Sequence, residues 1–428
     1  GTRMRSALPK VLHPLAGLPL VGHVLAIAEA LAPERRVVVV GAGGEAVAEA
    51  VAPWPSVVQE PQAGTGHALM QASDVLDGFT GDVLVLYGDT PLLEVETLST
   101  LLEARRKAAA ACAVLGFRAA DPGLYGRLVC DDDGTLERIV EAREADAETL
   151  AIDLCNSGVM AIDGEALPGL LSRLDNANSK GEYYLTDIVA IAAADGRSSV
   201  MAEAPEDSLL GIDSRADLAV AEAEIQTRLR ARAMAAGVTL TDPASVFFSH
   251  DTALAEDVTI GPNVVFGPGV RVGAGTEILP FCHLEGVEVT ARARIGPFAR
   301  LRPGTRLGEG ARIGNFVETK AAEIAAGAKV NHLSYIGDAS VGAASNIGAG
   351  TITCNYDGYA KYRTEIGAGA FIGSNTALVA PVSIGDGAMV GAGSTVTKDV
   401  EGDALAVARG QQRNVPDGAG RFRRQRED

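Results

Sequence analysis

The chain has 428 residues, of which 47% are hydrophobic and only 4% aromatic, and it contains 50 glycines. This length exceeds what one hydrophobic core usually fills, so we expect at least two ordered domains. Lys and Arg number 37 against 55 Asp and Glu, which gives a net charge of −18. A surface this acidic repels a phosphate backbone and argues against nucleic-acid binding.

The cysteines and the hydropathy of the sequence indicate the compartment in which the protein works. The five cysteines are scattered without a CxxC pair, which favours buried thiols in a reducing compartment over disulfides or a zinc site. No apolar run reaches membrane-spanning length and no secretory leader is recognisable, so we expect a cytoplasmic protein without membrane association. The only basic cluster lies within residues 421–426, in a tail that we expect to be solvated and disordered.

The front of the chain alternates short β-branched runs with helical patterns. Strands are predicted at 37–40, 56–58 and 83–86, and helices at 20–31, 45–51 and 95–107. This alternation is typical of a Rossmann-like α/β fold, with a mostly parallel sheet covered by helices on both faces. Ligands of such sheets collect beyond the carboxyl ends of the strands. A hairpin of residues 128–130 and 136–140 is expected to extend the sheet.

Three motifs in this half point to phosphate chemistry. The turn around Arg3 offers backbone N–H groups, and Arg3 and Lys10 supply positive charge. Gly64 and Thr65 open a helix after a strand, which suits a nucleotide. Asp89 follows the strand 83–86, where a carboxylate can bind Mg²⁺, although a turn or capping role is the alternative.

A fourth motif suggests a different cofactor. Residues 41–46 satisfy the pattern GxGxxG/A, and Glu60 lies about where a dinucleotide fold places its ribose-binding acid. Alone, this pattern would predict NAD. A dehydrogenase would explain neither the phosphate-directed residues nor the repeat that follows.

A long helix is predicted after the α/β half. Residues 214–237 are rich in Ala, Glu, Leu and Arg, and Gly and Pro are absent before Gly237. Ser214 can cap the helix at its start, and Gly237 can end it.

The strongest signal in the sequence is a repeat of six residues. From Ile260 to Val396 an aliphatic or aromatic residue recurs every six positions, apart from shortened repeats and one interruption before Ile366, and it is often followed by Gly. This period fits neither the 3.6 of a helix nor the 2 of an ordinary strand, but it is the hexapeptide period of a parallel β-helix. Three hexapeptides form one triangular coil with the aliphatic residues inside.

Two features interrupt this repeat. Residues 353–365 are inserted between Ile347 and Ile366, and His332 stands two positions after Val330, where other repeats carry small or acidic residues. A lone His is commonly structural, yet polar and cationic residues are conspicuous in this region, namely Arg302, Lys320, Tyr335, Asn346, Asn355, Tyr356 and Lys361. Such residues suit a sugar phosphate, and a neutral imidazole suits removal of a proton from an amine.

Together these motifs resemble the bifunctional N-acetylglucosamine-1-phosphate uridyltransferase/glucosamine-1-phosphate acetyltransferase family. The matching strings in the front half include GTRMRSALPKVLHPLAG, QEPQAGTGHA, LYGDTP and KGEYYLTDI; those in the repeat include GNFVETK, KVNHLSYIGDA and SNIGAGTITCNYDG. The front strings are shared with other sugar nucleotidyltransferases, whereas the repeat strings are more specific. The resemblance extends to about Arg409.

The resemblance implies the order of domains. Residues 1–213 would form the uridyltransferase domain, 214–237 the connecting helix, 238–408 a left-handed parallel β-helix with acetyltransferase activity, and 409–428 a tail. The enzyme would acetylate glucosamine 1-phosphate from acetyl-CoA and then transfer uridylyl from UTP to N-acetylglucosamine 1-phosphate. The product feeds peptidoglycan and lipopolysaccharide precursors. A homotrimer with sites between subunits is also implied.

The resemblance also implies site residues. UTP and N-acetylglucosamine 1-phosphate would be bound by Arg3, Lys10, Gln59, Gly64, Thr65, Gly126, Glu141, Asn156 and Asp213, with Mg²⁺, the one cofactor, on Asp89 and Asp213. His332 would be the general base; Arg302, Lys320, Tyr335, Asn346 and Lys361 would bind glucosamine 1-phosphate; Ala349, Asn355, Tyr356, Ser374, Ala392 and Arg409 would bind acetyl-CoA.

Two departures from the family stand out. Asp213 replaces an Asn in the metal-binding string, which adds a negative charge while keeping an oxygen ligand. The family's Leu-Ala-Ala-Gly stretch before the Gly-Thr-Arg-Met motif is absent from this sequence, and without it we expect weak uridylyl transfer. The alternatives are a single-activity nucleotidyltransferase with a structural β-helix and a non-catalytic trimeric scaffold.

Overall fold

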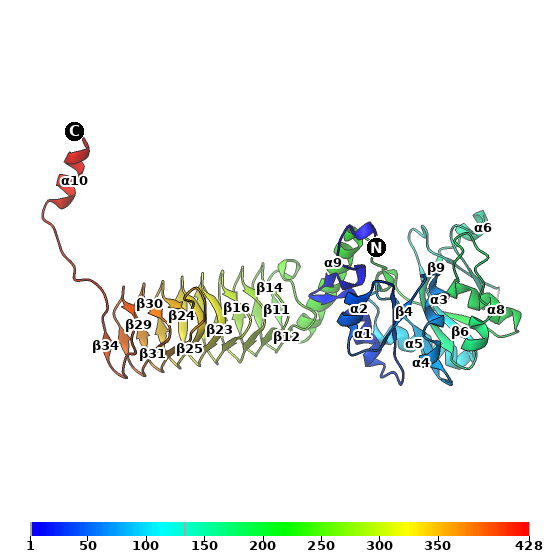
Figure 1. The fold of residues 1–428 in the computed structure, drawn as a ribbon, viewed down its shortest axis with the longest axis horizontal. Helices are drawn as coiled ribbons and strands as arrows, with labels where there is room; N and C mark the ends of the chain where they lie inside the picture. The colour runs from blue at the N-terminus through cyan, green and yellow to red at the C-terminus, as the bar shows by residue number, and fades with distance from the viewer. Residues whose placement is uncertain (1, 132–133, 428) are drawn as a thin grey trace. The chain divides into compact units, whose positions relative to one another are not determined.

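The computed structural model describes residues 2–131 and 134–427, which form two compact units that divide between Ile225 and Gln226. The first is an α/β unit, and the second is a coiled stack of short strands (Figure 1).

A six-stranded sheet with the order β10-β6-β9-β7-β8, in which β5 also pairs with β9, forms the centre of the α/β unit. Its strands are β5 (Asp82–Val85), β6 (Cys112–Arg118), β7 (Arg127–Cys130), β8 (Leu136–Val140), β9 (Leu154–Asp163) and β10 (Ser199–Glu203). Because β10 is parallel to β6, and β5, β6 and β7 are all antiparallel to β9, four strands run in one direction. The predicted hairpin is confirmed as β7 and β8, although residues 132 and 133 of its turn lie outside the described residues.

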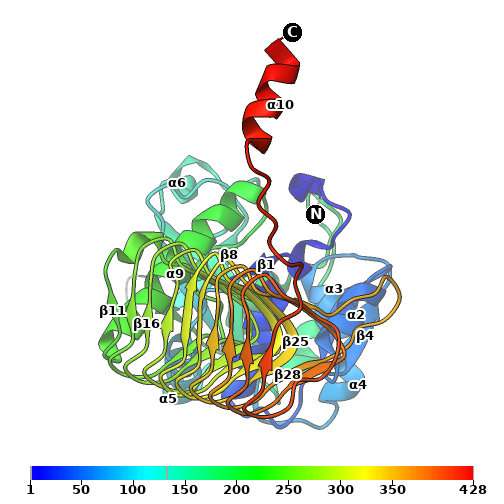
Figure 2. The ribbon, with the colours of Figure 1, turned by 90° about the vertical axis from the view of Figure 1, so that its left-hand side faces the viewer.

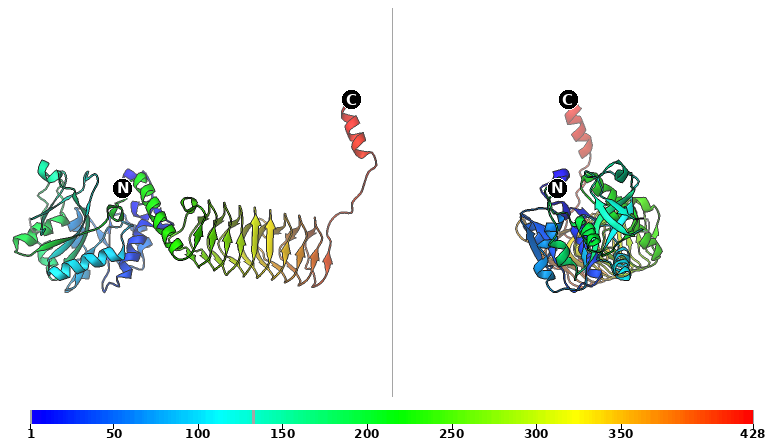
Figure 3. Two further views of the ribbon diagram at one scale, coloured as in Figure 1. Left: turned by 180° about the vertical axis from the view of Figure 1, so that it is seen from behind. Right: turned by 90° about the vertical axis from the view of Figure 1, so that its right-hand side faces the viewer.

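Helices cover both faces of this sheet (Figure 3). Val114 of β6 lies in a core with α7 (Leu167–Leu171) and α8 (Ile188–Ala194), whereas Leu115 and Phe117 lie in a core with α5 (Val95–Ala108). The alternating side chains of one strand therefore supply both cores. The other α-helices of this unit are α1 (Leu20–Ala30), α2 (Glu45–Val51), α3 (Thr65–Met70), α4 (Ser73–Leu76) and α6 (Ala147–Leu150). A separate two-stranded parallel sheet consists of β3 (Val38–Gly41) and β4 (Ser56–Gln59), which precede and follow α2 in the chain.

The predicted long helix is α9 (Arg215–Ala235). The Ser214 hydroxyl accepts a hydrogen bond from the Asp217 N–H at 3.2 Å, and the Asp217 carboxylate accepts one from the Ser214 N–H at 2.8 Å. This reciprocal pair is a capping box. Gly237 follows the helix with a φ of +90°, so both predicted ends are confirmed.

The second unit is the left-handed parallel β-helix that the repeat predicts (Figure 2). One face is a ten-stranded sheet of β11 (Thr239–Leu240), β13 (Thr259–Ile260), β16 (Glu277–Ile278), β19 (Arg294–Ile295), β22 (Arg312–Asn315), β24 (Lys329–His332), β26 (Asn346–Ile347), β29 (Phe371–Ile372), β32 (Met389–Val390) and β34 (Leu405–Ala406). Thr259 pairs with Glu277 and Glu277 with Arg294, so these two successive coils take 18 and 17 residues.

A fourteen-stranded sheet makes the other two faces. Its strands are β12 (Ala253–Leu254), β14 (Val265–Phe266), β15 (Arg271–Val272), β17 (His283–Leu284), β18 (Val287–Val289), β20 (Arg300–Leu301), β21 (Thr305–Leu307), β23 (Glu318–Ile324), β25 (Tyr335–Val341), β27 (Ile352–Cys354), β28 (Thr364–Ile366), β30 (Ala377–Val379), β31 (Val382–Ile384) and β33 (Thr395–Val396). It is continuous because β23 and β25 run around a corner, where Ala321 and Asp338 have positive φ.

The six-residue series forms the core of the coil. Ile260, Ile295 and Ile336 are fully buried, and one continuous apolar cluster contains residues from Val238 to Val396. Each such side chain contributes roughly 1.5–3 kcal/mol on burial. Gly follows these residues for a steric reason: a Cβ on Gly314 would overlap the backbone of Asn331 in the next coil.

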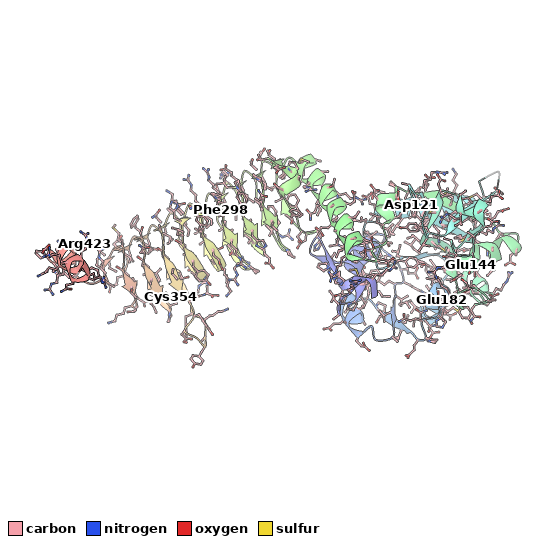
Figure 4. All side chains as sticks on the ribbon, turned by 90° about the horizontal axis from the view of Figure 1, so that it is seen from above. Asp121, Glu144, Glu182, Phe298, Cys354 and Arg423 are labelled. Carbon is pink, nitrogen blue, oxygen red and sulfur yellow. The ribbon has the colours of Figure 1, made fainter. Side chains whose placement is uncertain are left out.

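The inserted segment projects from the coil as predicted. Asn346 pairs with Phe371, which is 25 residues further on, so this coil holds more residues than the others. Figure 4 shows the extra residues as a loop that leaves the stack next to Cys354.

Three smaller expectations have outcomes in the structure. The five cysteines are free, and the expectation that they are buried holds for Cys112, Cys155 and Cys282, whereas Cys130 and Cys354 are only partly buried. None of the helices in the described residues is long and apolar enough to cross a bilayer. The expectation of a disordered tail is wrong for α10 (Gly418–Glu427), where Arg426 stacks on Phe422 and Arg424 pairs with Asp417.

Candidate functional sites

The α/β unit contains a cluster of four predicted charged residues. The Lys10 ammonium lies 2.6 Å from an Asp89 oxygen and 2.8 Å from an Asp213 oxygen, and the Arg3 guanidinium lies 2.7 Å from the other Asp213 oxygen. The Ile212 N–H donates to the Asp89 carbonyl at 2.9 Å, which holds the two acidic segments together. Residues separated by about 200 positions in the chain thus form one site.

The electrostatics of this cluster favour a positively charged Lys10. Burial alone would lower the pKa of Lys10, but its hydrogen bonds to Asp213 and Asp89 outweigh burial and raise it. Lys10 is therefore an ammonium throughout the neutral pH range. Asp89 and Asp213 offer only oxygen atoms, the ligands that hard divalent cations prefer. The described residues contain no group of three or more His, Cys, Asp or Glu that could hold a metal ion.

The residues predicted to hold the uracil lie together at the start of α3. The Gln59 amide donates to the Gly64 carbonyl at 2.8 Å, and the Thr65 hydroxyl accepts from the Leu185 N–H at 3.1 Å. Gly64 has a φ of +104°, and a Cβ there would lie 2.6 Å from the Tyr183 carbonyl oxygen. Only glycine fits this position. His67 follows these residues in the same helix, contacts Gln59 and packs near Tyr183, which favours a packing role for its ring over a role as a ligand.

The three predicted sugar-binding residues are also neighbours. The Asn156 N–H donates to the Gly126 carbonyl at 2.8 Å, and a Cβ on Gly126 would lie 3.7 Å from a Glu141 carboxylate oxygen. Burial raises the pKa of Glu141. A pocket of about 150 Å³ lies here, lined by Leu124, Glu141, Ala142, Arg143, Ser179, Lys180 and Tyr184.

Several acidic residues surround this pocket, and they were not predicted from the sequence. Burial, Asp175 and Glu144 raise the pKa of Asp187 to about 6. Glu144, labelled in Figure 4, accepts a hydrogen bond from the Ser179 hydroxyl at 2.9 Å. Arg143 and Lys180 are cations in the pocket lining, and the Lys180 ammonium lies over the Tyr184 ring.

In the β-helix, His332 belongs to a column of residues on successive coils. The column is Asn315, His332, Ala349, Ser374 and Ala392, and we call it the His332 column. Each of these residues accepts a hydrogen bond at its backbone carbonyl from the next coil; the donors are Leu333, Gly350, Asn375, Gly393 and the Arg409 guanidinium. The general base predicted from the sequence and four predicted acetyl-CoA residues therefore lie in one line.

His332 is exposed, and Asn315 holds its ring. The Nδ1 atom of His332 lies 2.8 Å from the Oδ1 atom of Asn315, and the two residues are partners in the parallel pairing of β22 and β24. Because an amide oxygen can only accept, this contact requires the proton on Nδ1, and in the neutral imidazole Nε2 then carries the lone pair. Sequence reasoning missed Asn315, although the same spacing from the core residue could have found it.

A second polar cluster of the β-helix joins the predicted phosphate-binding residues. The Lys320 ammonium lies 3.3 Å from Asp338, which also accepts from the Asn355 amide, and that amide lies 3.4 Å from the Tyr335 hydroxyl. The Lys320 and Lys361 side chains are neighbours, and the Lys320 cation lowers the pKa of Lys361. Two neighbouring ammonium groups favour an anion between them. Sequence reasoning missed Asp338.

The remaining predicted residues are more dispersed. The Arg302 guanidinium pairs with Glu318 at 2.9 Å, and Tyr356 is exposed in the projecting loop, in a bridge with Lys361. Asn346 lies in the ten-stranded sheet, whereas Lys320 and Tyr335 lie in the fourteen-stranded sheet. Their chain neighbours Ile347, Thr319 and Ile336 are buried, so the side chains point outward from different faces. The structure does not bring Asn346 together with Lys320.

Both units of the chain match families of known proteins. Residues 1–150 match the MobA-like NTP transferase domain family, and residues 363–398 match the bacterial transferase hexapeptide family. The chain is 60% identical over 426 residues to bifunctional protein GlmU of Paramagnetospirillum magneticum, with 99% of this chain and 95% of the relative covered. It is 61% identical over 424 residues to GlmU of Rhodospirillum rubrum, with the same coverage. The chain belongs to the GlmU family.

Membership of the GlmU family settles the broad function. The chain is a bifunctional enzyme with a uridylyltransferase domain and a hexapeptide-repeat acetyltransferase domain. The dehydrogenase alternative suggested by residues 41–46 is excluded, because that segment lies within the NTP transferase match. GlmU nucleotidyltransferase domains imply a divalent metal, and the family implies nucleotide-sugar and acyl-CoA substrates.

Proposed function

We propose that the His332 column is the acetyl transfer site and that His332 is its general base. The observation that carries this proposal is the line of small residues, Ala349, Ser374 and Ala392, that leads from His332 to Arg409. An extended thioester such as acetyl-CoA can lie along this line with its acetyl group at the imidazole. Asn355 and Tyr356 of the projecting loop would contact the same ligand.

The reaction follows from the free lone pair of Nε2. The amine of glucosamine 1-phosphate attacks the thioester carbonyl, a C–N bond forms and the C–S bond breaks. Nε2 takes the proton that the amine loses, and coenzyme A leaves as the thiolate. Lys320, Lys361, Arg302 and Tyr335 would hold the sugar phosphate.

We propose a homotrimer because one chain does not complete this site. Asn346 points away from Lys320 and Tyr335 in the same chain, since they lie on different faces of the coil. A neighbouring chain can supply Asn346 to a site formed by Lys320 of the first. A closed ring of three such contacts satisfies every site.

In the α/β unit we propose uridylyl transfer from UTP to N-acetylglucosamine 1-phosphate, with release of pyrophosphate. Arg3 and Lys10 would bind phosphate, Gln59, Gly64 and Thr65 the uracil, and Gly126, Glu141 and Asn156 the sugar. Asp89 and Asp213 would hold Mg²⁺, which neutralises charge on the phosphates when bound. The product, UDP-N-acetylglucosamine, would serve cell-wall precursor synthesis in the cytoplasm, where free thiols persist.

Two assays test the proposal and its single-activity alternative. One measures thiol release from acetyl-CoA with glucosamine 1-phosphate, and the other measures pyrophosphate release from UTP with N-acetylglucosamine 1-phosphate. The purified chain should carry out both reactions. Absence of thiol release would leave a nucleotidyltransferase with a structural β-helix.

Asn315 should matter for acetyl transfer alone. Asn315→Leu removes the acceptor that holds Nδ1–H, so the ring loses its orientation, and we expect kcat to fall about 10–100-fold. Asn315→Asp keeps the acceptor and should retain more activity than Asn315→Leu. Steady-state kinetics of both variants check this, and equal rates for the two would refute the positioning role.

Asp213 should tolerate asparagine, the residue that the resemblance predicts. Asp213→Asn keeps an oxygen ligand but removes one negative charge and weakens the pair with Arg3, so we expect apparent Mg²⁺ affinity to change by about tenfold or less. Asp213→Ala removes the ligand and should weaken affinity further. Magnesium titration of uridylyl transfer compares the variants; an unchanged Mg²⁺ dependence in Asp213→Ala would remove Asp213 from the metal site.

A further inference from the structure

The first turn of the connecting helix α9 binds the backbone on both sides of Asp213. One carboxylate oxygen of Asp217 accepts hydrogen bonds from two backbone N–H groups, that of Asp213 at 3.0 Å and that of Ser214 at 2.8 Å. These N–H groups belong to the two peptide groups that flank the Asp213 Cα atom, so Asp217 restrains both backbone torsions of Asp213. The direction in which the Asp213 side chain leaves the backbone is therefore fixed.

The bond to the Asp213 N–H is not needed for the helix itself. In a capping box the third helical residue binds the N–H of the cap residue, which here is Ser214. Asp213 lies before the cap, and its N–H is not among the groups that a helix leaves without partners at its start. The additional bond therefore acts on Asp213.

Asp213 needs this restraint because the contacts of its side chain are with flexible cations. Its two oxygens lie 2.8 Å from the Lys10 ammonium and 2.7 Å from the Arg3 guanidinium, and its side chain is 40% exposed. Under the proposed function, both cations turn toward phosphate when a nucleotide binds. The backbone bonds to Asp217 do not depend on these cations, so they hold the Asp213 carboxylate in place before and after that step.

The same turn of α9 also contacts the segment that carries Arg3. The Nε atom of Arg215 donates to the Met4 carbonyl at 3.3 Å, and its Nη1 atom lies 3.4 Å from the Nδ1 atom of His13. Met4 is 1% exposed and anchors this segment. The start of the chain lies beside α9 in Figure 1. The first turn of α9 thus contacts both the acidic and the basic segments of the charged cluster.

We infer that Asp217 is a positioning residue for uridylyl transfer, which directs the Asp213 carboxylate toward the phosphates and the divalent metal by fixing the Asp213 backbone. The inference rests on the proposed function and adds the start of α9 to the reaction site. Asp217 acts through Asp213 and does not contact the substrate. Partners that orient a metal ligand in this way are typically worth about 10–100-fold in metal affinity or activity.

Three variants test the inference. Asp217→Ala removes the acceptor of both N–H groups, whereas Asp217→Asn keeps an amide oxygen that can accept them. Ser214→Ala is the matched control, because it removes the other half of the capping box, the hydroxyl that binds the Asp217 N–H, and leaves the Asp213 N–H bonded. The measurements are Mg²⁺ binding by calorimetry, steady-state kinetics of both transferase reactions, and a thermal unfolding curve.

We expect Asp217→Ala and Ser214→Ala to lower the unfolding temperature alike, since each removes one half of the cap. Asp217→Ala alone should weaken Mg²⁺ binding and lower kcat of uridylyl transfer, each by about 10–100-fold. Asp217→Asn should restore most of both. Acetyl transfer should be unchanged in every variant.

An equal loss of Mg²⁺ binding in Ser214→Ala and Asp217→Ala would assign the effect to the helix cap and overturn the inference. A loss in Asp217→Asn as large as that in Asp217→Ala would also overturn it, because the charge of Asp217 and not its acceptor oxygen would then matter. Wild-type binding and rate in Asp217→Ala would do the same. If the wild type released no pyrophosphate from UTP, the proposed function would fail instead, and Mg²⁺ binding by the variants would still decide the role of Asp217.

Discussion

His332→Ala should lower acetyl transfer by about 10²–10⁴-fold and leave uridylyl transfer at the wild-type rate. The loss follows from the geometry at the corner of the coil, where Asn315 holds Nδ1–H and Nε2 is the free proton acceptor. A glucosamine amine is largely protonated near neutral pH and becomes nucleophilic only when a base removes its proton. Alanine leaves water as the acceptor, so the loss should appear in kcat rather than in KM for acetyl-CoA.

His283→Ala is the control for this experiment. His283 lies in β17 of the same coil stack, on another face and three coils before His332, and its loss should change neither activity. Thiol release from acetyl-CoA and pyrophosphate release from UTP, measured on one preparation of each variant, compare the two. If His332→Ala kept more than about a tenth of the acetyl transfer rate, His332 could not be the general base.

The architecture of the β-helix could be predicted from the sequence because its period is unique to that fold. The spacing of the buried series from Ile260 to Val396 predicts which residues fill the core. The number of residues in a coil then predicts which residues lie next to each other on successive coils. The same logic places His332 in line with Ala349, since 17 residues make one coil. Asn315 lies one coil earlier and could have been found in the same way.

Contacts that depend on side-chain direction could not be predicted. Asp338 contacts Lys320 and Asn355 because it lies at the bend of β25, where its own φ is positive. The six-residue repeat does not mark that bend. The stacking of Phe298 on Phe316 likewise depends on a left-handed backbone that hydrophobic periodicity does not reveal. In the α/β unit, Lys10 was a candidate from its own motif, whereas Asp213 was predicted from resemblance alone, and their contact spans 203 positions.

Asp89→Asn should lower uridylyl transfer by about 10²–10³-fold while acetyl transfer is unchanged. The substitution keeps the shape of the side chain but removes one of two carboxylates that face Lys10, at 2.6 and 2.8 Å. Lys10 then loses one of the two hydrogen-bonded anions that raise its pKa and turns toward Asp213, away from the phosphates that it should bind. Because oxygen donors of unit charge hold divalent cations most strongly, Mg²⁺ affinity should fall as well.

Calorimetric titration with Mg²⁺ separates these two effects from a general loss of structure in Asp89→Asn. Asp74→Asn is the matched control, because Asp74 is an exposed carboxylate on α4 and its substitution should alter neither activity nor Mg²⁺ binding. Retention of wild-type Mg²⁺ affinity together with a slow reaction would assign Asp89 to the orientation of Lys10 rather than to the metal. Wild-type uridylyl transfer in Asp89→Asn would show that the carboxylate pair around Lys10 is not the reaction centre, and the pocket beside Glu141 would then be the place to look for it.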